Sequence, residues 1–96
     1  MTGVLVFQKR PERVQAMQWD NTPESAKQVA AWTDPEGWTF QLSRPAPFGG
    51  YVFELIDPDG QPTDVYPNGW IVRVGTGMFQ VLRELEFRAG YERVIV

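Results

Sequence analysis

The sequence predicts an α+β fold, in which a strongly curved, mostly antiparallel sheet or a small, partly open barrel carries one helix from the N-terminal half. Three observations lead to this class. Up to eight short segments have strand-like patterns, one segment has the start and stop signals of a helix, and the 96 residues contain no internal repeat. With one helix to cross between strands, most neighbouring strands must pair antiparallel. A chain of this length is expected to form one domain over residues 1–96.

The first third of the chain is predicted to hold two strands and the helix. Residues 4–7 are β-prone, Pro11 interrupts pairing because it has no N–H to donate, and residues 14–19 resume a strand. The helix is predicted over residues 23–33, because Thr22 suits the N-cap and Pro23 the first helical position.

The rest of the chain alternates apolar and polar residues with the period of a strand. The predicted strands cover residues 38–42, 51–56, 63–66, 70–74, 79–81 and 91–96. Turn sequences separate several of them: Asp57-Pro58-Asp59-Gly60, Pro67-Asn68-Gly69 and Gly75-Thr76-Gly77. Residues 43–50 are expected to form a loop, and residues 83–87 fit either a single helical turn or an irregular bend.

The composition excludes several kinds of chemistry. The chain has no His and no Cys, so it lacks the usual general base, the Ser-His and Cys-His nucleophiles and most transition-metal ligands. Asp57, Asp59 and Asp64 form the densest acidic cluster, but the prolines between them fit a solvated hairpin turn better than a cation loop. We therefore predict no catalytic residue, no metal site and no cofactor.

Charge and hydropathy argue against nucleic-acid and membrane partners. The net charge is −3, and Lys9, Arg10 and Arg13 are the one basic cluster, which gives too weak a field for nucleic acid. No window approaches the roughly 20 apolar residues of a membrane helix, and the start of the chain lacks the apolar core of a signal peptide. A cytoplasmic location is expected.

Aromatic residues are the most prominent candidates for a binding role. Four Trp are many for 96 residues, and aromatic side chains anchor protein interfaces as well as cores. The loop around Phe48 carries an apolar ring between flexible flanks, and it can either dock a partner or fold back onto the core. The residues predicted to bind a protein partner are Trp19, Phe48, Trp70 and Tyr91.

An alternative hypothesis is a small anionic ligand inside the curved sheet. Arg73 or Arg93 would point inward and hold the anion next to aromatic rings such as Trp38. This hypothesis predicts an inward-facing arginine close to two rings.

Two stretches of the chain resemble a group of small uncharacterised accessory proteins of actinobacterial tailed phages. The first runs from Val14 to Asp20 and continues through a short helix that ends at Trp32. The second is the hairpin segment Pro67-Asn68-Gly69-Trp70 through Phe79, where the group usually reads Pro-Gly-Asp-Trp. The resemblance implies a phage gene expressed in the cytoplasm of a bacterial host. It implies no reaction and no catalytic residues.

These observations together predict a non-enzymatic protein that acts by protein–protein interaction, with itself or with a host or phage protein. The contact surface would combine exposed aromatic residues with an unpaired strand edge. The last strand, 91–96, has neither Lys nor Pro to protect its edge, so it is the predicted site of a homodimer.

Overall fold

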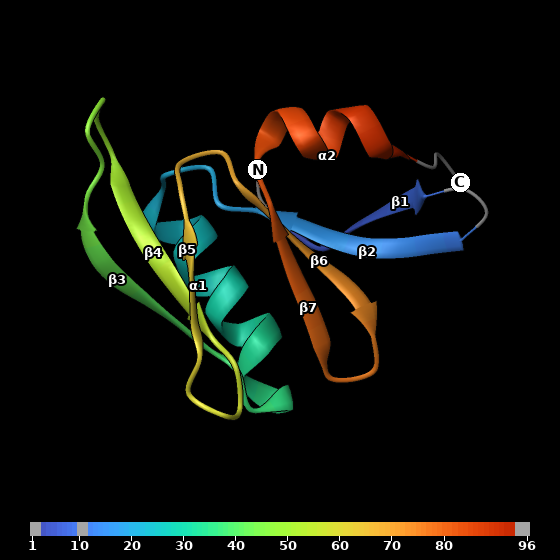
Figure 1. Cartoon of the computed structure of the whole chain (residues 1–96), viewed down its shortest axis with the longest axis horizontal. Helices are drawn as coiled ribbons and strands as arrows, with labels where there is room; N and C mark the ends of the chain where they lie inside the picture. The colour runs from blue at the N-terminus through green and yellow to red at the C-terminus, as the bar shows by residue number, and fades with distance from the viewer. Residues whose placement is uncertain (1–2, 10–11, 94–96) are drawn as a thin grey trace.

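Antiparallel strands and two helices make up the part of the chain that the structure, a computed structural model, describes, which is residues 3–9 and 12–93 (Figure 1). In chain order the elements are β1 (Leu5–Lys9), β2 (Glu12–Gln18), α1 (Pro23–Thr33), the 3-10 helix η1 (Asp34–Glu36), β3 (Thr39–Pro45), β4 (Tyr51–Ile56), β5 (Pro62–Val65), β6 (Trp70–Gly75), β7 (Met78–Leu82), α2 (Glu84–Gly90) and β8 (Glu92–Arg93). The α+β class, the antiparallel pairing and the N-terminal-half helix are therefore confirmed.

The described strands form two separate sheets rather than one curved sheet or a partly open barrel. Sheet A has the strand order β7-β6-β2-β1-β8, and sheet B has the order β3-β4-β5. The prediction of one continuous sheet is wrong because the chain leaves sheet B after β5, and β6 pairs with β2 instead. Backbone hydrogen bonds fix this change of sheet, since Asn68 N donates to Trp19 O at 2.8 Å and Trp19 N donates to Gly69 O at 2.9 Å.

Strand β6 is the centre of the molecule because it is buried on both faces. Ile71 packs into a core between sheet A, α1 and sheet B, whereas Trp70 and Val72 pack into a second core beneath α2. Strand β2 also contributes side chains to both cores, Met17 to the first and Ala16 to the second. Side chains alternate across a strand, so a continuous apolar run such as residues 70–72 can fill both layers.

Helix α1 begins as its sequence predicts. The Oγ1 of Thr22 accepts a hydrogen bond from Ser25 N at 3.1 Å, and Pro23 lies in the first turn. The helix lies between the two sheets (Figure 1), and its Val29 is fully buried in the first core. The hydrophobic cluster around Val29 therefore holds the two sheets together.

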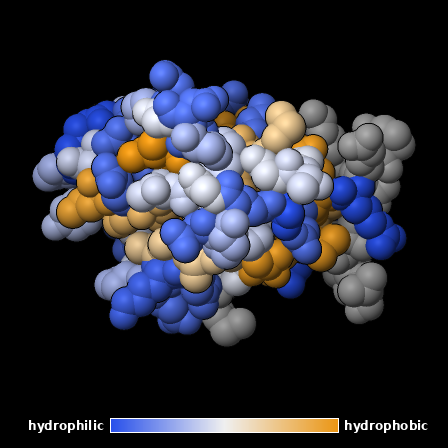
Figure 2. Space-filling model, turned by 90° about the horizontal axis from the view of Figure 1, so that it is seen from below, coloured by the Kyte–Doolittle hydropathy of each residue, from blue (hydrophilic) through white to orange (hydrophobic). Residues whose placement is uncertain are grey.

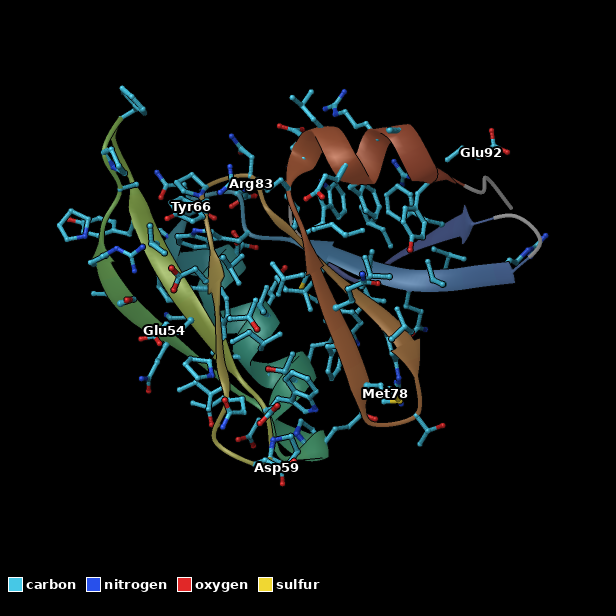
Figure 3. All side chains as sticks on the ribbon, viewed as in Figure 1. Glu54, Asp59, Tyr66, Met78, Arg83 and Glu92 are labelled. Atoms are coloured by element: carbon cyan, nitrogen blue, oxygen red, sulfur yellow. The ribbon has the colours of Figure 1, made fainter. Side chains whose placement is uncertain are left out.

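Helix α2 covers the opposite face of sheet A. It is longer than the single turn or bend considered from the sequence, and Glu86 Oε1 accepts a hydrogen bond from Arg83 N at its start. Its Phe87 stacks on Trp70 and Tyr91, with ring centroids 4.1 and 4.9 Å apart, and meets Phe7 edge-on. Figure 3 shows aromatic rings between α2 and the strands of sheet A. An aromatic cluster thus holds a helix that is too short to be stable alone.

Candidate functional site

Two of the four predicted partner-binding residues lie in the cores. Trp19 is 3% exposed, and its Nε1 donates to Tyr51 O at 3.0 Å. Trp70 is 8% exposed, because α2 covers its ring. The expectation that these two indoles form exposed contact surface is wrong, since a 96-residue chain with two small cores needs its largest side chains to fill them.

Phe48 lies fully in solvent, with a relative exposure of 102%. It occupies the connection between β3 and β4, where Ala46 N donates to Gly50 O at 2.9 Å and Gly49 N donates to Ala46 O at 3.3 Å. The end of this hairpin is also fixed to the start of α1, because Tyr51 N donates to Asn21 Oδ1 at 3.0 Å. The loop therefore presents Phe48 from a hydrogen-bonded backbone.

Two further apolar side chains are exposed on the same hairpin. Leu42 on β3 and Tyr51 on β4 are each more than half exposed. Alternation places them on the face of sheet B that buries Phe40 and Leu55, towards the end that carries the loop. We call Leu42, Phe48 and Tyr51 the hairpin patch.

Tyr91 and the last strand are only partly available for contact. The Tyr91 ring is half-buried against Phe87, and β8 forms one edge of sheet A next to β1. Residues 94–96 lie outside the described residues, so the dimer strand predicted over 91–96 is seen only as the two residues of β8. Strand β3, an edge of sheet B, has seven residues.

The three residues of the alternative ligand site do not converge on a shared cavity. Arg73 Nη2 donates to Glu36 Oε1 at 2.7 Å, and Glu36 Oε1 also accepts from Gly77 N at 2.8 Å. Trp38 Nε1 donates to Gly77 O at 3.0 Å. Arg73 and Trp38 therefore meet around the β6–β7 turn, where Glu36 already neutralises the guanidinium. Arg93 is exposed on β8, opposite Phe7 of β1.

The acidic cluster folds as the turn that its sequence predicts. Asp57 Oδ1 accepts from the backbone N–H groups of Asp59 and Gln61, each at 2.9 Å. Asp64 instead forms an ion pair with Arg44 at 2.9 Å. Within residues 3–9 and 12–93 no group of three or more acidic side chains is arranged to hold a metal ion.

A groove of about 610 Å³ lies between the two sheets and was not predicted. Thr63 and Asp64 of β5 line one side, and Val81 and Leu82 of β7 line the other. Tyr66 contributes its ring, which two guanidinium carbons approach: that of Arg83 at 5.1 Å and that of Arg44 at 5.9 Å. Figure 3 shows Tyr66 and Arg83 close together at the same end of the molecule as α2.

The charges around this groove are mixed. Asp64, Glu84 and Glu86 are its acidic lining residues, and Arg83 is its basic one. The pKa of Arg44 is raised above its usual value, first by its hydrogen bond to Asp64 and then by the charge of that carboxylate. The Arg44 guanidinium donates to Asp64 and to the Tyr66 hydroxyl. Sequence reasoning missed the groove because β5 and β7, which line it, are separated in the chain by β6.

Comparison with known proteins finds no match to this chain among family models, curated proteins or solved structures. No helix in the described part of the chain is long and apolar enough to cross a membrane.

Proposed function

We propose that this chain is a non-enzymatic interaction protein that binds another protein through the hairpin patch. The observation that carries the proposal is the complete exposure of Phe48 on a loop whose backbone is fixed by hydrogen bonds. Leaving a phenyl ring in water forgoes about 1.5–3 kcal/mol of burial free energy. Phenylalanine has only two side-chain dihedral angles, so its ring loses little rotamer entropy when it enters a partner's pocket.

The surroundings of Phe48 support a larger contact. Leu42 and Tyr51 add apolar surface, and the β3 edge offers backbone N–H and C=O groups to an added strand. Figure 2 shows one face of the molecule, on which apolar residues lie in small, separated patches. That face therefore has no extended apolar surface that would be a stronger candidate for a protein contact. The resemblance to phage accessory proteins makes a host or phage protein the proposed partner, and a second copy of the chain is the other candidate.

The alternative hypothesis of a small anionic ligand receives less support. Its leading arginine, Arg73, already pairs with Glu36, and Arg93 lies on a different strand edge. An anion would need to displace that carboxylate, whereas the hairpin patch is open.

The test compares three proteins: the original chain, Phe48→Ser and the matched control Leu85→Ser. Leu85 is also strongly exposed, but it lies on α2, away from the hairpin. Light scattering over a concentration series measures self-association, and quantitative capture from a lysate of the encoding cells measures binding to other proteins.

We expect Phe48→Ser to weaken the interaction at least about 30-fold, as loss of a hot-spot side chain does, and Leu85→Ser to leave it unchanged. Equal binding by all three proteins, or equal loss in both variants, would contradict the proposal. Self-association that depends on Phe48 would identify the partner as a second copy.

A further inference from the structure

The turn that carries the chain from sheet B to sheet A contains a chemically reactive pair of residues. Gly69 N donates to Tyr66 O at 2.8 Å, and Asn68 has a φ of 69°. Because Pro67 precedes it, Asn68 occupies the third position of a type II turn, which requires a positive φ. We call residues 66–69 the junction turn. Asn68-Gly69 is the only asparagine–glycine pair in the sequence.

The fold restricts both positions of this pair. A positive φ at position 68 favours glycine, asparagine or aspartate. Gly69 is buried, and a Cβ atom there would lie 2.8 Å from Tyr66 O and 3.2 Å from Val65 Cγ1. The turn therefore has no room for a side chain at position 69, and the reactive pair is part of the way the two sheets are joined.

An asparagine that precedes glycine undergoes spontaneous deamidation, because glycine has no side chain to hinder its backbone nitrogen. The Gly69 nitrogen attacks Asn68 Cγ, so that an N–Cγ bond forms and the Cγ–Nδ2 bond breaks. The departing Nδ2 group takes the proton of the Gly69 nitrogen and leaves as ammonia. Water then opens the succinimide at either carbonyl, which yields aspartate or isoaspartate. Isoaspartate carries the backbone through Cγ and adds one atom to the main chain.

In the folded chain the attacking nitrogen is held by a hydrogen bond. The Gly69 N–H must leave Tyr66 O before its nitrogen can reach Asn68 Cγ. Three further bonds join the junction turn to the end of β2: Asn68 N donates to Trp19 O at 2.8 Å, Trp19 N donates to Gly69 O at 2.9 Å, and Gln18 Nε2 donates to Asn68 O at 3.1 Å. These bonds fix the backbone on both sides of the reacting peptide bond, so the reaction requires the turn to separate from β2.

We propose that Asn68 is a site of spontaneous deamidation that the fold protects, and that it is modified when the junction turn separates from β2. The extra atom of isoaspartate would lie between Asn68 N and Gly69 O, the two groups that bond to Trp19. A chain modified while the turn is open would therefore not regain both bonds. The inference does not depend on the hairpin patch.

The test incubates the full chain in mildly alkaline buffer, either folded or unfolded in guanidinium chloride. Peptide mapping by mass spectrometry measures deamidation and distinguishes aspartate from isoaspartate. Asn21, the other asparagine, is an internal control, because the β-branched Thr22 hinders attack by its backbone nitrogen. Gln18→Ala removes the side-chain bond to Asn68 O, and Gln41→Ala, at an exposed position of β3, is the matched control.

We expect Asn68 to deamidate at least about tenfold faster in the unfolded chain than in the folded chain, and faster than Asn21 in the unfolded chain. Gln18→Ala should accelerate the reaction of the folded chain about two- to tenfold and leave that of the unfolded chain unchanged. Gln41→Ala should change neither rate. Equal rates in the folded and unfolded chains, or no preference for Asn68 over Asn21, would overturn the inference.

The product is compared with the Asn68→Asp variant, which adds the same charge without lengthening the backbone. After removal of the denaturant, the isoaspartyl chain should either fail to refold or unfold at a lower guanidinium concentration than Asn68→Asp. Equal stability of the two chains would contradict the expected loss of the bonds to Trp19.

Discussion

Glu36 bonds to two residues, Arg73 and Gly77, that lie 37 and 41 positions further along the chain. Its Oε1 accepts from Arg73 Nη2 and from Gly77 N, so one carboxylate fixes both a strand and the turn that follows it. Arg73 is 35% exposed and Glu36 is 18% exposed, so solvent weakens this ion pair only in part. Nothing in the local sequence of Asp34-Pro35-Glu36 indicates such a partner.

At this scale we predict that Glu36→Ala lowers the free energy of unfolding by about 1–3 kcal/mol, because it leaves Arg73 and Gly77 N without their acceptor. Glu36→Gln keeps an oxygen for Gly77 N and should cost less. Urea denaturation followed by tryptophan fluorescence measures both changes. Equal losses in the two variants would show that the charge, rather than the acceptor for Gly77 N, is what matters.

At the scale of the element, α1 depends on its N-cap. Thr22→Ala removes the acceptor of Ser25 N and should destabilise the protein by about 1 kcal/mol, whereas Thr22→Ser retains the hydroxyl and should cost much less. Thermal unfolding followed by circular dichroism compares the two. A Thr22→Ser variant as unstable as Thr22→Ala would indicate that the methyl group, not the hydrogen bond, is responsible.

Helix α2 depends on tertiary packing instead. Phe87 is 2% exposed and touches the rings of Phe7, Trp70 and Tyr91, so Phe87→Ala should cost about 3–5 kcal/mol. Hydrogen exchange should show the amides of residues 84–90 losing protection first. Ala89→Ser, on the exposed side of the same helix, is the control and should leave stability nearly unchanged. Uniform loss of protection along the chain would argue against separate opening of α2.

At the scale of the whole molecule, β6 joins the two cores. Ile71 and Val72 are adjacent, fully buried and directed to opposite faces. Ile71→Ala should cost about 2–5 kcal/mol, Val72→Ala should also be strongly destabilising, and each variant should still unfold in one transition. Tryptophan fluorescence and far-ultraviolet circular dichroism would report that transition at the same urea concentration. Two separated transitions would show that the cores are independent.

The local elements could be predicted from the sequence, whereas their arrangement could not. Thr22-Pro23 marks the start of α1, and Asp57-Pro58-Asp59-Gly60 marks a turn in which Gly60 N donates to Asp57 O, because both signals act over a few residues. Whether β6 pairs with β5 or with β2 depends on long-range packing. The alternation of apolar and polar residues within a strand does not indicate its neighbour. A single sheet was therefore expected where two are found.

The same limit applies to the candidate sites. Phe48 stands out locally as a phenyl ring between Pro and Gly residues, and the structure leaves it exposed rather than folded back onto the core. Trp19 and Trp70 carry equally strong sequence signals but are buried, since residue type does not distinguish a core anchor from an interface anchor. The groove depends on the tertiary approach of β5 and β7, for which no local motif exists.

The β6–β7 turn differs in one respect from the β4–β5 turn. Gly77 is held through both its N–H and its C=O, by Glu36 and Trp38, whereas the hydrogen bonds of Asp59 and Gly60 stay within their own turn. A protease that needs several residues of pliable chain should therefore cut near Asp59 and leave Thr76-Gly77 intact. Mass spectrometry of the first fragments in a limited digest would show which of the two turns is cleaved.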